Sequence, residues 1–117
     1  MTIELGVVIA ERSLEIPGHP ELDIRVKIGV PQHFPDDPEE TDFYCPYQIT
    51  GIGSEKVRYM GGVDSMQALI LAIKILPVHL DLLRRDYPGL CWLNLPAGQY
   101  GIDSTRPSMD DSGKVTD

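Results

Sequence analysis

The chain has 117 residues, enough for one domain with a real core but not for two. Acidic side chains outnumber basic ones by 18 to 10, and the formal net charge is −8. Because an acidic surface repels the phosphate backbone, this composition argues against nucleic-acid binding and favours association with a basic partner.

The first third of the chain has the pattern of an antiparallel hairpin. Residues 7–16 predict a strand whose apolar positions change phase. Either a bulge lies near Ala10 or Glu11, or the first few residues lie outside the sheet. The segment 17–20 (PGHP) is typical of a turn. Residues 22–30 then alternate between apolar and polar side chains, with Asp23, Arg25 and Lys27 on the polar face. We expect these two strands to pair antiparallel.

An acidic loop separates this hairpin from a second one. Prolines within residues 31–42 oppose regular pairing, so we expect the whole segment to be loop. Residues 43–52 predict a third strand, in which Pro46 indicates an edge position or a bulge. Gly51 and Gly53 mark a turn, after which residues 55–60 predict a fourth strand that pairs back on the third.

The only long helical pattern lies at residues 61–85. Asp64 is suited to be the N-cap, and Gln67 completes a capping box. Pro77 predicts either a bend that follows a twisted sheet or a break between two helices. Because Lys74 interrupts the apolar run, we expect no membrane span. The first half is apolar nearly all round, so we expect it to be buried on more than one side. The predicted buried stripe consists of Met66, Leu69, Ile70, Ile73, Leu76, Leu80 and Leu83.

These elements predict an α+β fold. After the Pro88-Gly89 stop, residues 90–95 (LCWLNL) predict a short last strand. The expected architecture has two layers, an antiparallel sheet of four to five strands packed on one long, proline-kinked helix, in the order ββββαβ. We expect residues 1–103 to form a single domain and residues 104–117 to form a flexible acidic tail.

No residue cluster has the spacing of a catalytic or metal site. His19, His33 and His79 lie in separate elements, without the paired spacing of zinc ligands. Cys45 and Cys91 fall in strand patterns, which favours buried free thiols in a reducing compartment. We therefore expect no enzyme activity, no metal and no cofactor. Because the N-terminus lacks the pattern of a signal peptide, we expect a cytoplasmic location.

The acidic loop is the most distinctive polar feature. It lacks the regular ligand spacing and central glycine of a calcium loop. It is either a solvated surface loop or a contact patch for a basic partner. Tyr44, on the face opposite Cys45, could join such a contact, because tyrosine is enriched at binding hot spots. The predicted partner-binding residues are Asp36, Asp37, Glu39, Glu40, Asp42 and Tyr44.

Two motifs resemble a family of small bacterial domains of unknown function. The first is the strand FYCxYxIxG, from Phe43 to Gly51, and the second is GxDxxQAL, from Gly62 to Leu69, which opens the helix. The resemblance spans residues 43–92. It implies a strand, a glycine turn and a capped helix, and it brings no catalytic residues. In size, charge and lack of catalytic groups, the chain is also similar to the immunity proteins of bacterial toxin systems.

Our leading functional expectation is a non-enzymatic protein-binding module, in particular an immunity protein that binds and neutralises a toxin. Its acidic loop would contact a basic toxin domain, and the polar sheet face with Asp23, Arg25 and Lys27 could extend that contact. One alternative is an enzyme or small-ligand-binding domain with a pocket between helix and sheet, near Pro77. Another is a homodimer built on an exposed sheet edge or face.

Overall fold

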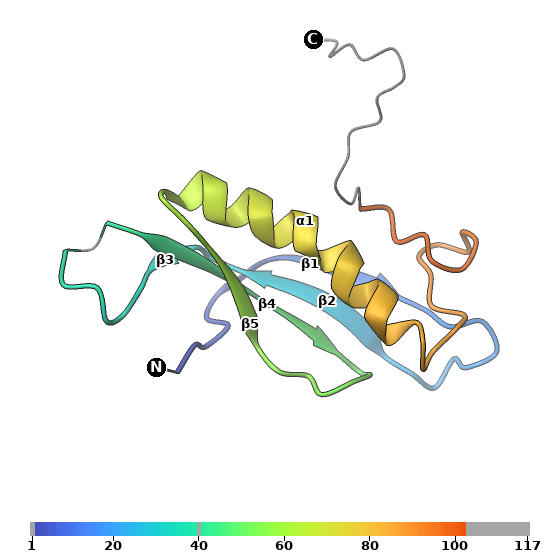
Figure 1. The fold of residues 1–117 in the computed structure, drawn as a ribbon. Coiled ribbons are helices and arrows are strands. Elements are labelled where there is room, and N and C mark those ends of the chain that lie inside the picture. Colours follow the sequence, from blue (N-terminus) through green and yellow to red (C-terminus); the bar gives the residue numbers. More distant parts are fainter. Residues whose placement is uncertain (1, 40, 103–117) are drawn as a thin grey trace, which may run out of the picture.

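The computed structural model describes residues 2–39 and 41–102, which form two layers (Figure 1). The strands are β1 (Val8–Leu14), β2 (Ile24–Gly29), β3 (Gln32–His33), β4 (Phe43–Thr50) and β5 (Arg58–Gly62), and the helix is α1 (Ser65–Leu83). The five strands form one antiparallel sheet in the order β1-β2-β4-β3, with β5 paired to β4. α1 lies across one face of the sheet, which confirms the predicted α+β fold.

The first hairpin follows the sequence prediction closely. β1 pairs antiparallel with β2, and the register shifts between Val8 and Ala10. This shift is the predicted bulge, and it reconciles the change of phase in the apolar pattern. Residues that pair directly lie on the same face of a sheet. Leu14 and its partner Ile24 are both buried on the face that packs against α1.

The second part of the sheet differs from the prediction in two respects. β3 lies within the segment predicted to be loop, and it continues the path of β2 along β4. Ile28 pairs with Tyr47 and Gln32 pairs with Tyr44, so the ladder is interrupted opposite Pro46. The edge position predicted for Pro46 is wrong, because β4 lies between β2 and β5. The proline fits this central strand because its pairing partner is Tyr59 of β5 alone.

The start of α1 is capped much as the sequence predicted. The Asp64 carboxylate accepts a hydrogen bond from the Gln67 amide at 2.8 Å. The Gln67 side chain accepts from the Val63 amide at 2.7 Å, one residue before the N-cap rather than at it. α1 continues without a break through Pro77, so the alternative of two separate helices is wrong.

The buried face of α1 is narrower than predicted. Met66 is 68% exposed, and Ile70 and Ile73 are exposed as well, so the predicted stripe is wrong at these three positions. A Cβ atom added at Gly62 would lie 2.6 Å from the Ala68 nitrogen. The helix therefore approaches the sheet too closely for long side chains in its first turns. The buried helical residues are Ala68, Ala72, Leu76, Pro77 and Leu80.

This exposure leaves α1 with an apolar outer surface. By length and composition alone the helix could cross a membrane, with a mean hydropathy of 1.7, and 28% of that window is buried in the structure. Lys74, on which the expectation of no membrane span was based, does not by itself exclude such a span. A single helix of this kind is weak evidence for a membrane span, since core helices of soluble proteins pass the same test. The cytoplasmic location remains a prediction.

Residues 90–102, here called the C-terminal clasp, pack beside the helix rather than forming the predicted last strand. An isolated bridge joins Cys91 to Glu15, with both N–O distances at 2.9 Å. Leu93 and Asn94 then adopt positive φ angles of 51° and 60°, which extended chains do not have. The prediction of a strand at residues 90–95 is wrong because the chain turns there.

Arg12 fastens the clasp to the sheet. It pairs with Val26, which places it on the helix-facing side of β1, where the alternation calls for an apolar residue. Its guanidinium carbon lies 3.7 Å from the centre of the Trp92 ring. It also donates hydrogen bonds to the carbonyl oxygens of Tyr100 and Gly101, at 3.1 and 3.0 Å. The buried Leu90 and Tyr100 thereby join the core. The predicted tail, 104–117, lies outside the described residues.

Candidate functional site

The acidic loop between β3 and β4 is organised by one of its own carboxylates. Asp37 accepts hydrogen bonds from the backbone amides of Glu39, Thr41 and Asp42, at 3.0, 3.0 and 3.2 Å. It also accepts from the Thr41 hydroxyl at 3.1 Å. These donors, with the Asp42 amide foremost, lower the pKa of Asp37 to about 2. Asp37 therefore holds the loop in shape, and its charge is largely committed within the loop.

Three other acidic residues of this loop leave their carboxylates open to solvent. Asp36, Glu39 and Asp42 are all exposed. The loop is closed at its base, where the Phe34 amide donates to the Asp42 carbonyl at 3.3 Å. The predicted contact residue Glu40 lies outside the described residues. The loop thus presents at least three carboxylates from a defined backbone.

Tyr44 does not have the exposed position that its predicted role in partner binding requires. It is 5% exposed, although it does lie on the predicted face, opposite Cys45. Its ring centre lies 5.3 Å from that of Phe34 and 6.0 Å from that of Tyr59. Phe34 and Tyr59 also meet edge to face at 5.8 Å. The prediction of Tyr44 as a surface contact is therefore wrong, because the other two rings cover it.

Phe34, Tyr44 and Tyr59, here called the aromatic corner, lie on the sheet face away from α1. The exposed member is Tyr59, at 42%. Burial raises the pKa of Tyr44, and the negative charge of Glu4 adds to that effect. The Phe34 amide donates to the Asp42 carbonyl, and the Phe34 carbonyl accepts from the Asp37 amide, so the acidic loop begins at the corner. The aromatic corner therefore adjoins the acidic loop, a combination that suits recognition of a basic partner surface.

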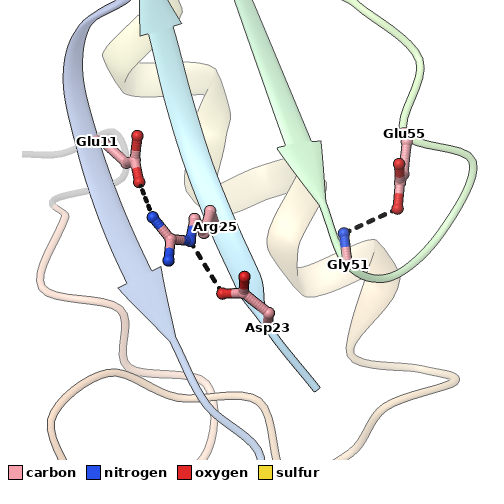
Figure 2. Close-up of polar contacts among 5 residues, drawn as sticks. All are labelled: Glu11, Asp23, Arg25, Gly51 and Glu55. Atoms are coloured by element: carbon pink, nitrogen blue, oxygen red, sulfur yellow. Dashed lines mark hydrogen bonds and ion pairs between the residues drawn. The ribbon is translucent and has the colours of Figure 1, made fainter. Parts of the chain in front are cut away.

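The remainder of this sheet face carries an ion-pair network. Arg25 donates to Glu11 at 2.6 Å and to Asp23 at 2.9 Å, as Figure 2 shows. These two carboxylates, with Asp23 the larger influence, raise the pKa of Arg25. Because Asp23 and Arg25 already form an ion pair with each other, they contribute less charge to a partner contact than the sequence suggested. Lys27, on the same face, is half-buried.

A cleft opens on the opposite side of the sheet, between the second half of α1 and the turn that joins β4 to β5. Its volume is about 150 Å³. Ile49 and Ile52 form the sheet side, and Leu82 and Leu83 form the helix side. This is a pocket between helix and sheet, a few residues beyond Pro77.

The cleft contains a hydrogen-bonded pair that sequence analysis did not predict. The Tyr47 hydroxyl lies 2.5 Å from Nδ1 of His79. Burial raises the pKa of Tyr47 to about 12. Burial, followed by the nearby Arg58 charge, lowers the pKa of His79. Both groups are therefore neutral near pH 7, and the histidine tautomer decides which of the two donates in this hydrogen bond.

The cysteines are not set up as nucleophiles. Both are free and buried. Burial raises the pKa of Cys45 to about 11 and also raises that of Cys91. A thiol with a raised pKa is a poor nucleophile at neutral pH. Among residues 2–39 and 41–102, no cluster of histidine, cysteine and carboxylate side chains could hold a metal ion.

The sequence does not reveal the partners of Tyr44 and Tyr47, because each partner lies in another part of the fold. Phe34 falls within the segment predicted to be loop, and His79 falls outside the predicted buried stripe of the helix. The alternation along β4 does place Tyr47 on the buried face, where its hydroxyl needs a partner. That need was a usable signal, but the sequence does not show which helical residue meets it.

Fold and site together define a small two-layer α+β domain without a recognisable catalytic centre among its described residues. Residues 10–104 match the family model described as a domain of unknown function, DUF6968. Because the match covers most of the chain, the protein belongs to this family, in agreement with the resemblance found in its motifs. Comparisons with curated proteins and with solved structures found no match.

Proposed function

We propose that this protein is a non-enzymatic protein-binding module, and specifically an immunity protein that binds and neutralises a toxin with a basic surface. The observation that carries the proposal is the aromatic corner that adjoins the acidic loop through Phe34. The exposed Tyr59 ring offers apolar contact area and meets Phe34 edge to face. Phe34 is hydrogen-bonded to Asp37 and Asp42 of the acidic loop, whose residues Asp36, Glu39 and Asp42 are exposed. Central aromatic anchors with a charged rim are the usual arrangement of a binding hot spot.

The order of the acidic loop adds to this argument. Asp37 restrains the loop by accepting hydrogen bonds from three backbone amides and from the Thr41 hydroxyl. A partner therefore meets carboxylates whose positions are already restricted, which lowers the entropic cost of binding. Such carboxylates can stand in for an anionic substrate within a basic toxin cleft, and they accelerate association through electrostatic steering.

The test is a calorimetric titration of the protein against the product of the gene next to its own. We expect binding with a dissociation constant below 1 μM, as an order of magnitude. Tyr59→Ala should weaken this binding about tenfold or more, because it removes the exposed anchor. If no binding occurs at micromolar concentration, the pairing with that gene product is refuted.

A charge-matched pair of variants tests the surface itself. Asp36→Asn with Glu39→Gln removes two charges from the loop. Glu21→Gln with Asp86→Asn removes two exposed charges that lie outside it. The first variant should slow association and reduce its salt dependence, whereas the second should change both less. Equal effects from the two variants would show that the acidic loop is not the contact surface.

A further inference from the structure

The cleft between α1 and the β4–β5 turn has a chemistry that differs from the rest of this acidic protein. Two cationic side chains, Lys56 and Arg58, line it. Arg58 pairs directly with Tyr47 across β4 and β5, so it lies on the helix-facing side of the sheet, next to the Tyr47–His79 pair. Its charge acts on both members of that pair.

Neither cation has a carboxylate partner within residues 2–39 and 41–102. The ion pairs described there engage His19, Arg25 and Arg84 instead. The carboxylate that lines the cleft, Glu55, accepts a hydrogen bond from the Gly51 amide at 2.9 Å, as Figure 2 shows. In a chain with a net charge of −8, the rim of this cleft therefore carries two cations against one committed carboxylate.

The walls of the cleft fix the size and polarity of what it can hold. Ile49, Ile52, Leu82 and Leu83 present branched aliphatic groups from sheet and helix. A volume of about 150 Å³ matches that of an apolar cavity known to admit a benzene-sized molecule. The opening leaves room for a polar group to face the rim. Apolar walls with a few convergent polar groups are typical of small-molecule sites.

We propose that this cleft binds a small monocarboxylate whose apolar body is about the size of a benzene ring. The body packs between Leu82 and Ile49, and the carboxylate faces Arg58, whose planar guanidinium can donate two parallel hydrogen bonds. Lys56 adds a second positive charge. In the tautomer in which Nδ1 accepts from Tyr47, the Nε2 proton of His79 is a further donor. This site lies on the opposite sheet face from the aromatic corner, so the inference does not depend on the protein-binding proposal.

Benzoate is the probe for the first test, and benzyl alcohol is its neutral counterpart of similar shape. We expect benzoate to cause saturable shifts of amide and His79 ring signals in NMR spectra, with a dissociation constant of about 1 mM. Benzyl alcohol should bind about tenfold more weakly, because it cannot engage the cations. Equal affinity of the two probes would overturn the carboxylate assignment. Benzoate shifts confined to residues outside the cleft, or no saturation by about 10 mM, would overturn the site.

Two arginines on opposite faces of the sheet provide a matched pair of variants. Arg58→Gln should remove the preference for benzoate over benzyl alcohol and leave the weaker, shape-dependent binding. Arg25→Gln removes the same charge from the other sheet face, so it should leave that preference in place. Leu82→Asn should weaken binding of both probes, since Leu82 is an exposed residue of the apolar wall and its replacement spares the core. If Arg58→Gln and Arg25→Gln affect benzoate equally, the cationic rim does not select the ligand.

Discussion

Replacing Arg12 with glutamine should destabilise the protein markedly, although the side chain is only partly buried. The change removes a cation that lies 3.7 Å above the Trp92 ring, an interaction worth about 1 kcal/mol. It also removes two hydrogen bonds to the carbonyl oxygens of Tyr100 and Gly101, worth about 1 kcal/mol each. The expected loss in free energy of unfolding is therefore about 2–3 kcal/mol.

Urea denaturation followed by tryptophan fluorescence measures this loss directly, because Trp92 is the only tryptophan in the chain. A loss of about 2–3 kcal/mol should lower the urea midpoint by roughly 1–2 M. The emission of the folded variant should also move to longer wavelength, since Trp92 loses the side chain that covers it. Amide hydrogens of the clasp, such as that of Gly98, should exchange faster.

The control is Arg25→Gln, which removes an identical charge from β2, on the other face of the same hairpin. Arg25 forms two ion pairs, but both are solvent-exposed, so the variant should shift the urea midpoint much less. If Arg12→Gln shifts the midpoint no more than Arg25→Gln and leaves the Trp92 emission unchanged, the clasp is not held by Arg12 and the reasoning is refuted.

Three further predictions follow from the packing and the pKa shifts. Ala72→Leu should lower the free energy of unfolding by about 1–3 kcal/mol, because the alanine is fully buried beneath the helix. Ile70→Ala on the exposed flank should change it by less than about 0.5 kcal/mol. Equal losses in urea denaturation would contradict the observed orientation of α1. Asp64→Ala removes the N-cap and should lower the free energy of unfolding by about 1 kcal/mol in the same urea assay. An unchanged urea midpoint would show that the cap contributes nothing. Asp37 has a folded-state pKa of about 2, below its usual 3.8, so it stabilises the fold above pH 4 and loses this contribution as the pH falls towards 2. Asp37→Asn should therefore be less stable than the native chain at pH 6, with the difference vanishing near pH 2; a difference that is constant with pH would contradict the role of the carboxylate.

Local patterns were enough to predict most of the sheet. Alternation in β2 and the turn chemistry on either side identified the two hairpins, and the phase change in β1 located its bulge. These features depend on neighbours in sequence, which is why a single sequence reveals them. The cap at Asp64 belongs to the same class.

The errors concern contacts between distant segments. Periodicity showed that α1 is apolar, but it could not show that Gly62 lets the backbone approach so closely that alanines form the contact. The burial of Tyr44 depends on Phe34, which lies beyond a turn, and the clasp depends on the pairing of Arg12 with Trp92. Tertiary packing of this kind overrides local propensity.

The clasp also has a consequence for the order of folding. β1 with β2, and β4 with β5 and α1, are built from segments close in sequence, whereas the Arg12 hydrogen bonds join residues 88 and 89 positions apart. Closing so long a loop loses conformational entropy before the favourable contacts form. The clasp should therefore dock after the rate-limiting barrier. Interactions absent from the transition state act on the unfolding rate. Loosening the clasp should therefore speed unfolding in stopped-flow experiments and leave refolding nearly unchanged, so that this last segment sets the lifetime of the native state.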